Sequence, residues 1–171
     1  MAIIIDDESR VFSLHTKNAT YQMKADAQNV LLHTYYGEKT DNSDKSLLFY
    51  QTDRGFSGNP HEMGKIDRTY SMDSLLQEYS CFGTGDYRIT SLKVQNKDGS
   101  RAAELRYTGY RVQKGKYGIP DMPAVYAENE EAETLVIRLE DPYSGMEVEL
   151  YYGILEDMDV ITRAVKITNM G

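Results

Sequence analysis

The sequence has few of the residues on which disulfides and metal sites depend. Of its 171 residues, one is cysteine, three are histidine, four are proline and none is tryptophan. The single thiol, Cys81, has no partner for an internal disulfide, which fits a reducing compartment, and we expect it to be packed rather than nucleophilic. The histidines His15, His33 and His61 lie far apart, and no C-x-x-C or H-x-x-x-H pattern occurs. We therefore expect no metal and no cofactor.

Long apolar runs and an excess of positive charge are also missing. No window reaches the length of a transmembrane helix, and the start MAIIIDDESR has neither the basic residues nor the apolar run of a signal peptide. The formal net charge is -8, and a surface of that sign repels phosphate groups. We expect a cytoplasmic protein that binds neither nucleic acid nor a membrane. With 40% hydrophobic and 27% charged residues, the composition fits one globular domain.

Apolar residues alternate with polar ones along most of the chain, and fourteen tyrosines favour strands. The pattern predicts about nine short antiparallel strands and no βαβ unit. The fold class is therefore expected to be all-β, an antiparallel β-sandwich with little helix. The rows that carry this prediction are 2–5, 10–16, Tyr21/Met23/Ala25, Leu31/His33/Tyr35, Thr90/Leu92/Val94, Leu105/Tyr107, Tyr110/Val112, Leu135/Ile137/Leu139, Met146/Val148/Leu150/Tyr152 and Ile161/Arg163/Val165/Ile167.

Three local signals refine this prediction. Asn96-Lys97-Asp98-Gly99 is the strongest hairpin turn in the sequence. Gly109 lies where the inward row changes phase, which predicts a β-bulge. Residues 72–78, with Ser71 as a cap, are the only helical candidate and are expected to form a single turn.

A connection from residue 51 to residue 88 separates the two groups of strands. Its length predicts a functional segment, and its aromatic residues indicate an ordered one. The neighbours Asp67-Arg68 and the pair Asp86 and Arg88 are expected to form ion pairs, because an adjacent arginine keeps a carboxylate ionised. Gly83-Thr84-Gly85-Asp86 predicts a tight turn better than a phosphate loop.

Asp53-Arg54-Gly55-Phe56 places an acid, a base and an aromatic ring within four residues of this connection. Sugar sites use such a combination, with polar groups for the hydroxyls and a ring face for the apolar side of the pyranose. A loop that merely packs its own phenylalanine explains the pattern equally well. No G-x-S-x-G motif occurs that would point to a serine nucleophile.

Several longer segments carry a resemblance to a known family. They are TDRGFSGNP at 52–60, DRTYSMDSLLQEYSCFGTGDYR at 67–88, DGSRAAELRY at 98–107, GIPDMPAVYAENEEAETLVIRLED at 118–141 and LEDMDVITRAVKITNMG at 155–171. In this order they resemble the N-terminal region of glycoside hydrolase family 36 α-galactosidases. The resemblance runs from about His15 to Gly171.

The resemblance implies a β-sandwich similar to galactose mutarotase-like supersandwiches, placed before a catalytic (β/α)8 barrel. The family hydrolyses terminal α-galactosides such as melibiose and raffinose with retention, using two aspartates on the barrel. No segment here matches the barrel, so no catalytic residue is assigned. Residues 1–171 are then an incomplete N-terminal domain, inactive alone and the front part of a larger protein. The end of the sequence directly after a predicted strand agrees with this expectation.

In tetrameric members of the family, a loop of this domain reaches the active site of a neighbouring subunit. The matching residues are 53–60, so the resemblance implies Asp53 and Phe56 as substrate contacts, with Arg68 as a weaker candidate. Gly55 and Gly58 stand where bulkier residues are expected in many relatives. The implied partners are α-galactosides, the barrel of the same protein and further copies in a homo-oligomer.

Two other functions compete with this interpretation. One is a free-standing carbohydrate-binding or interaction module that uses the tyrosine-rich faces as its platform. The other is a mutarotase-like enzyme. We favour the mutarotase-like enzyme less, because its chemistry needs a histidine and a glutamate that lie close together, and the sequence gives no sign of such a pair.

Overall fold

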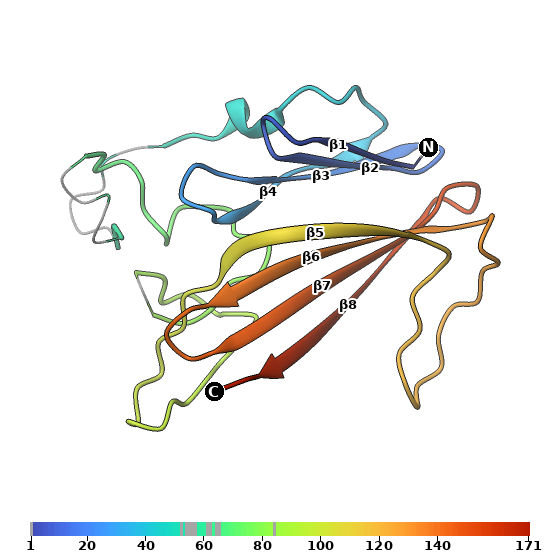
Figure 1. Cartoon of the computed structure of the whole chain (residues 1–171). Helices are drawn as coiled ribbons and strands as arrows, with labels where there is room; N and C mark the ends of the chain where they lie inside the picture. Colours follow the sequence, from blue (N-terminus) through green and yellow to red (C-terminus); the bar gives the residue numbers. More distant parts are fainter. Residues whose placement is uncertain (1, 52, 54–57, 61–62, 64–65, 84) are drawn as a thin grey trace.

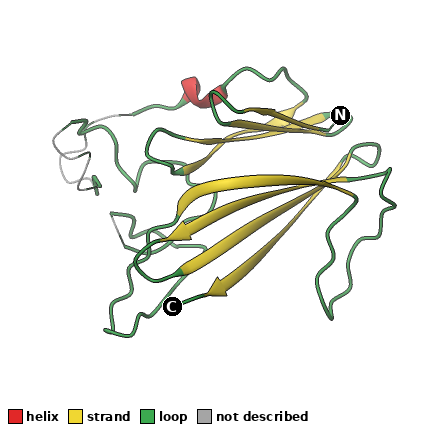
Figure 2. Cartoon of the chain, in the orientation of Figure 1, coloured by secondary structure: helices red, strands yellow, loops and turns green. Residues whose placement is uncertain are grey.

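The computed structural model describes residues 2–51, 53, 58–60, 63, 66–83 and 85–171. Two antiparallel sheets face each other, as Figure 1 and Figure 2 show, with almost no helix. This confirms the predicted antiparallel β-sandwich. In the described part of the chain the strands number eight, one fewer than expected. In the first sheet, the strands in order are β1 (Ile3–Asp6), β2 (Val11–His15), β3 (Ala19–Ala25) and β4 (Leu31–Glu38). In the second they are β5 (Arg106–Lys114), β6 (Glu133–Asp141), β7 (Met146–Leu155) and β8 (Val160–Asn169).

The core lies between the two sheets and contains most residues of the predicted inward rows, although Tyr110 and Val112 of β5 stay 38% and 45% exposed. Leu135, Ile137 and Leu139 of β6 are buried, as are the alternate residues of β7 that they face across the ladder. Phe12 and Met23 close the core from the first sheet. Since side chains alternate across a strand, each strand contributes every second residue to this layer. At the edge strand β8 the row is incomplete, because Val165 and Ile167 remain 44% and 49% exposed.

The predicted β-bulge in β5 is confirmed. The register of β5 against β6 shifts between Tyr107 and Gly109, so that Thr108 is the extra residue. Tyr107 and Tyr110 thereby share one face, and both rings contact Phe12, at centroid distances of 5.8 and 5.3 Å. The bulge thus restores a common inward face, as the phase change in the sequence indicated.

A short 3-10 helix that the sequence did not predict, η1 (Lys45–Leu48), follows β4. The described residues between η1 and β5 are gathered at one end of the sandwich (Figure 1). The expected turn at 96–99 forms, with Gly99 at a φ of 84°, but the row Thr90/Leu92/Val94 is not a regular strand. The amide groups of Ser91 and Leu92 donate to the carbonyl of Ser80 instead of to a returning strand. Leu92 and Val94 nevertheless pack against the core.

The predicted helical turn at 72–78 is a single hydrogen-bonded turn, in which the amide of Leu75 donates to the carbonyl of Ser71 at 3.1 Å. It goes no further because the next residues bond to the edge of β4. The amide of His33 donates to the carbonyl of Leu76, and the amide of Glu78 donates to the carbonyl of Leu31. The connection therefore completes this edge of the first sheet and fixes where Glu78 lies. Among the described residues, no helix has the length and apolarity needed to cross a bilayer.

Candidate functional site

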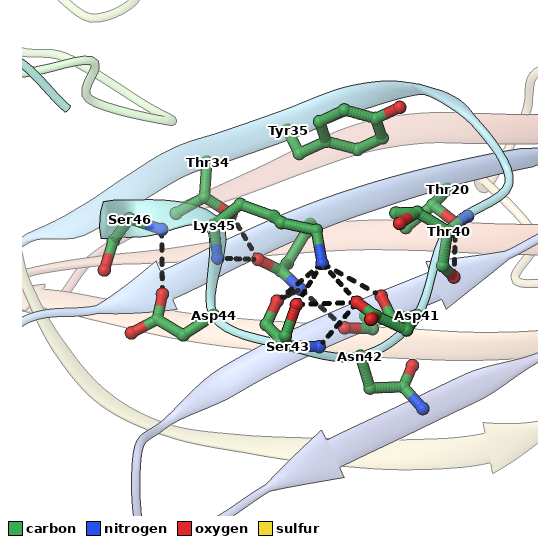
Figure 3. Close-up of polar contacts among 12 residues, drawn as sticks. Thr20, Thr34, Tyr35, Thr40, Asp41, Asn42, Ser43, Asp44, Lys45 and Ser46 are labelled. Atoms are coloured by element: carbon green, nitrogen blue, oxygen red, sulfur yellow. Dashed lines mark hydrogen bonds and ion pairs between the residues drawn. The ribbon is translucent and has the colours of Figure 1, made fainter. Parts of the chain in front are cut away.

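A polar anchor at residues 41–45, on the outer face of the first sheet, precedes the connection. Figure 3 shows Lys45 folded back over Asp41 and Ser43. Its ammonium group donates to the Asp41 carboxylate at 2.6 Å and to the hydroxyl and carbonyl of Ser43 at 2.6 and 2.9 Å. The hydrogen bonds from Lys45 and Ser43 lower the pKa of Asp41 to about 2. The segment thus closes on itself before it leaves the sheet.

Gln22 of β3 joins this anchor to the sheet below it. Its buried amide nitrogen donates to Ser13 and to the carbonyl of Ser43, both at 3.0 Å. Its oxygen accepts from the hydroxyl of Thr34 at 3.0 Å and from the amide of Lys45 at 2.9 Å. All four hydrogen-bonding positions of the amide are used. The connection therefore starts from a fixed point.

His15 belongs to the same anchor. It is buried, and its ring nitrogens lie 2.9 Å from the hydroxyl of Thr20 and 2.6 Å from the side-chain oxygen of Asn42. His15 is therefore a structural, hydrogen-bonded residue. Within the described ranges, His, Cys, Asp and Glu side chains form no group of three that could hold a metal ion.

Two of the three sequence-predicted site residues meet beyond the anchor. Arg68 Nε lies 3.1 Å from Asp53 Oδ2, and the two side chains are 64% and 43% exposed. Phe56 lies outside the described residues. The expected partner of Arg68 was its neighbour Asp67, and that prediction was wrong. Asp67 instead accepts the hydroxyl and amide of Thr69 at 2.6 and 2.8 Å, and these bonds lower its pKa.

Hydrogen bonds and a close backbone contact hold Gly58 and Asn59 in place. The side chain of Asn59 donates to the carbonyls of Arg68 and Tyr70, and the Tyr70 hydroxyl donates to Asp26 at 2.6 Å. Gly58 crosses Gly85 so closely that a Cβ on Gly58 would lie 2.1 Å from the Gly85 carbonyl oxygen. Any larger residue at Gly58 would therefore displace the backbone at Gly85.

The tight turn predicted at 83–86 is confirmed. Gly83 and Asp86 exchange two backbone hydrogen bonds of 3.1 Å, and Gly83 and Gly85 both have a φ of 98°. The predicted ion pair also forms, with Arg88 Nη2 2.7 Å from Asp86 Oδ2. Burial opposes the ionisation of Asp86, but the hydrogen bonds and charge of Arg88 outweigh it and lower the pKa of Asp86. The pair holds the connection together, since the same guanidinium donates to the carbonyls of Met72 and Leu75.

A second polar group, which the sequence did not predict, lies between the sheets. The side chain of Glu78 is 2% exposed, and its carboxylate accepts the hydroxyls of Tyr21 and Tyr152 at 2.7 and 2.8 Å. Arg163 Nη2 lies 2.5 Å from Glu78 Oε1, and His33 Nδ1 lies 3.4 Å from Oε2. We call these five residues the Glu78 cluster.

The cluster favours the ionised form of Glu78. Burial raises the pKa of this carboxyl, but His33, the charge of Arg163 and the two tyrosine hydroxyls together lower it further. Burial and the adjacent carboxylate raise the pKa of Tyr21 and Tyr152, so both hydroxyls stay protonated as donors. The result is a fixed, buried carboxylate rather than a proton donor.

One signal in the sequence could have revealed this cluster. Arg163 occupies an inward position in the row Ile161/Arg163/Val165/Ile167, and a charged residue there needs a buried partner. The partner could not be chosen, because β3, β4, β7, β8 and the connection each contribute one member. The predicted lack of convergence between a histidine and a glutamate was wrong for His33 and Glu78.

Comparison with known proteins places this geometry in a family. The chain matches the "Glycosyl hydrolase family 36 N-terminal domain" over residues 29–171. It is 50% identical over 171 residues to the bifunctional alpha-galactosidase/sucrose kinase AgaSK of Mediterraneibacter gnavus, covering 100% of this chain and 18% of that protein. It is 38% identical over 172 residues to alpha-galactosidase AgaA of Geobacillus stearothermophilus, covering 100% of this chain and 23% of that protein.

Solved structures agree with the sequence comparison. The galactosidase domain of AgaSK superimposes with a TM-score of 0.95 at 49% identity, covering 99% of this chain and 23% of that chain. A variant of AgaA from Geobacillus stearothermophilus in complex with raffinose gives a TM-score of 0.88 at 40% identity, covering 94% of this chain and 22% of that chain. The chain thus spans about a fifth of the length of these relatives.

Proposed function

Since this chain belongs to the N-terminal domain family of glycosyl hydrolase family 36, we propose that it is the non-catalytic sandwich of an α-galactosidase. The whole protein would hydrolyse terminal α-galactosides of the melibiose and raffinose type with retention. The observation that carries this proposal is the match of the whole chain to about a fifth of α-galactosidases such as AgaSK and AgaA. Residues 1–171 then support a catalytic barrel on the rest of the protein.

The carboxylates of this chain fit a supporting role. A glycosidase needs one carboxylic acid with a raised pKa beside a second carboxylate. Glu78, Asp86 and Glu149 are buried, but each is paired with an arginine, and the pKa of each is lowered. Such groups stay ionised near neutral pH. They stabilise the sandwich and cannot act as the general acid.

We propose that the exposed pair Asp53 and Arg68, with Phe56, forms one edge of the galactoside pocket. Upstream of this pair Gln22 fixes the backbone at Ser43 and Lys45, and on its other side Gly58 packs closely against Gly85. A half-exposed carboxylate and guanidinium side by side can accept from and donate to neighbouring sugar hydroxyls. We also propose that this segment faces the active site of a neighbouring copy in a homo-oligomer, and that the protein is cytoplasmic.

Purified residues 1–171 are expected to show no turnover of p-nitrophenyl α-galactoside, because the proposed function places the reactive acids on the rest of the protein. The measurement is release of p-nitrophenol, with the whole protein as the positive control. Turnover that copurifies with the chain would overturn the assignment of catalysis to other residues. An open reading frame that stops at codon 171 would favour a free-standing carbohydrate-binding module instead.

In the whole protein, Asp53→Ala is expected to raise the KM for raffinose about three- to tenfold with kcat nearly unchanged. A lost contact to a bound sugar affects ground state and transition state alike. Asp157→Ala, which removes an exposed carboxylate in the β7–β8 turn, is the matched control. Equal kinetic constants for Asp53→Ala and the control would show that Asp53 does not contact the substrate and that its segment has only a structural role.

A further inference from the structure

A pocket of about 530 Å³ opens beside the Glu78 cluster, on the side of the sandwich where β4 and β8 lie. Tyr21, His33 and Tyr36 line it from the first sheet, and Arg163 lines it from β8. Glu78 contributes from the connection. This volume falls within the range of about 300–1,000 Å³ that is typical of small-molecule sites. The pocket is separate from the Asp53–Arg68 pair, because neither of these residues lines it.

The charges around the pocket cancel. Glu78 is paired with Arg163 at 2.5 Å, and Arg88, which also lines the pocket, is paired with Asp86 at 2.7 Å. Of the two carboxylates, Glu78 lines the pocket and Asp86 lies behind Arg88. Together they balance the two guanidinium groups, so a charged ligand gains little net attraction. The lining therefore favours an uncharged, polar ligand.

The polar groups that remain available include both a donor and an acceptor. Arg163 has five N–H donors, directs one to Glu78 and stays 48% exposed. His33 Nδ1 is buried and faces the Glu78 carboxylate at 3.4 Å, outside the geometry of a regular hydrogen bond. Because a carboxylate only accepts, we assign the ring proton to Nδ1, which leaves Nε2 as an acceptor. A hydroxyl group can satisfy both residues, because it donates and accepts.

An aromatic ring completes the wall of the pocket. Tyr36 is 68% exposed, yet its ring packs against the buried Tyr21 at a centroid distance of 5.7 Å. A rigid ring of this kind presents an apolar face at little entropic cost. The apolar face of a pyranose matches it, while the hydroxyls at the ring edge reach the polar groups.

We propose that this pocket binds one neutral pyranose unit, stacked on Tyr36 and hydrogen-bonded to Arg163 and His33. The site adds a second sugar contact to the one formed by Asp53, and it does not depend on the hydrolytic activity of the whole protein. A missing galactosidase activity would overturn the proposed function and leave this site unaffected.

In the test, D-galactose is titrated into the chain, and binding is monitored by heteronuclear NMR. Saturable shifts are expected at Tyr36 and at the ring nitrogens of His33. Tyr36→Ala is expected to weaken binding about fivefold or more, which is the loss of one ring contact. Tyr143→Ala removes a tyrosine that is 87% exposed in another loop, and it is expected to bind like the parent chain. Unchanged spectra outside the pocket establish that both variants fold.

Three results would overturn the proposal. One is the absence of saturable shifts at millimolar galactose. Another is equal affinity of Tyr36→Ala and Tyr143→Ala. The third is tighter binding of galactose 6-phosphate or galactosamine than of galactose, because the cancelled charges would then not govern selection.

Discussion

Replacing Glu78 with alanine is expected to lower the free energy of unfolding by about 2–4 kcal/mol. The carboxylate is the common acceptor of two buried tyrosine hydroxyls and of Arg163. Without it, the hydroxyls of Tyr21 and Tyr152 lose their partner inside the core, and each unsatisfied group costs about 1–3 kcal/mol. Arg163 contributes less to the loss, because it is half exposed and can turn to water.

The matched control is Glu140→Ala on the exposed face of the second sheet. Glu140 also forms an ion pair with an arginine, Arg138, but these side chains are 32% and 50% exposed. Exposed pairs contribute about 0–1 kcal/mol, so this variant is expected to unfold near the parent midpoint. Urea denaturation of both variants measures the difference. Equal losses would show that the Glu78 cluster does not join the sheets.

The same cluster predicts the dependence of stability on pH. The folded-state pKa of Glu78 is lowered from its ordinary value near 4.5, so its contribution is present above that value and is lost as the pH falls. Glu78→Gln cannot titrate, and its stability is expected to fall less steeply below pH 5 than that of the parent. Parallel curves of unfolding midpoint against pH would contradict the assignment of an ionised Glu78.

Gln22→Leu is expected to destabilise the chain by about 2–4 kcal/mol. The leucine would leave the amide of Lys45, the carbonyl of Ser43 and the hydroxyls of Ser13 and Thr34 without their partner. The chain around Lys45 can move towards water, which keeps the loss below the sum of four buried groups. Hydrogen exchange at the Lys45 amide is expected to accelerate together with the loss of stability.

Gln113→Leu in β5 is the control for this change, because Gln113 is exposed on an edge strand. Such a substitution is expected to stay within about 0.5 kcal/mol of the parent. If Gln22→Leu behaved like Gln113→Leu, the anchor would not fix the start of the connection, and Asp53 would lose its structural support.

The regular part of the fold follows from side-chain alternation. Leu135, Ile137 and Leu139 lie where the period of two places them, and the phase change at Gly109 locates the bulge. The period fails between residues 71 and 95, where hydrogen bonds to β4 and within the connection replace both a helix and a strand. Such bonds involve backbone groups, which the side-chain pattern does not specify.

For a similar reason, the sequence identified some residues of the polar sites and missed others. Residue types near one another in the sequence identified the Asp86–Arg88 pair and singled out Asp53. Local reasoning paired Arg68 with Asp67, whereas the folded connection brings Asp53 to it. The Glu78 cluster needed the register of four strands, since its members are separated by up to 142 positions between Tyr21 and Arg163. Only the inward position of Arg163 signalled it.

The most direct test of the central claim is a crystal structure of the whole protein with raffinose bound. The account predicts a carboxylate oxygen of Asp53 within about 2.6–3.2 Å of a sugar hydroxyl. It also predicts no acid of residues 1–171 beside the scissile glycosidic oxygen. A sugar that lies out of reach of Asp53, or a glycosidic bond flanked by an acid of this chain, would contradict it.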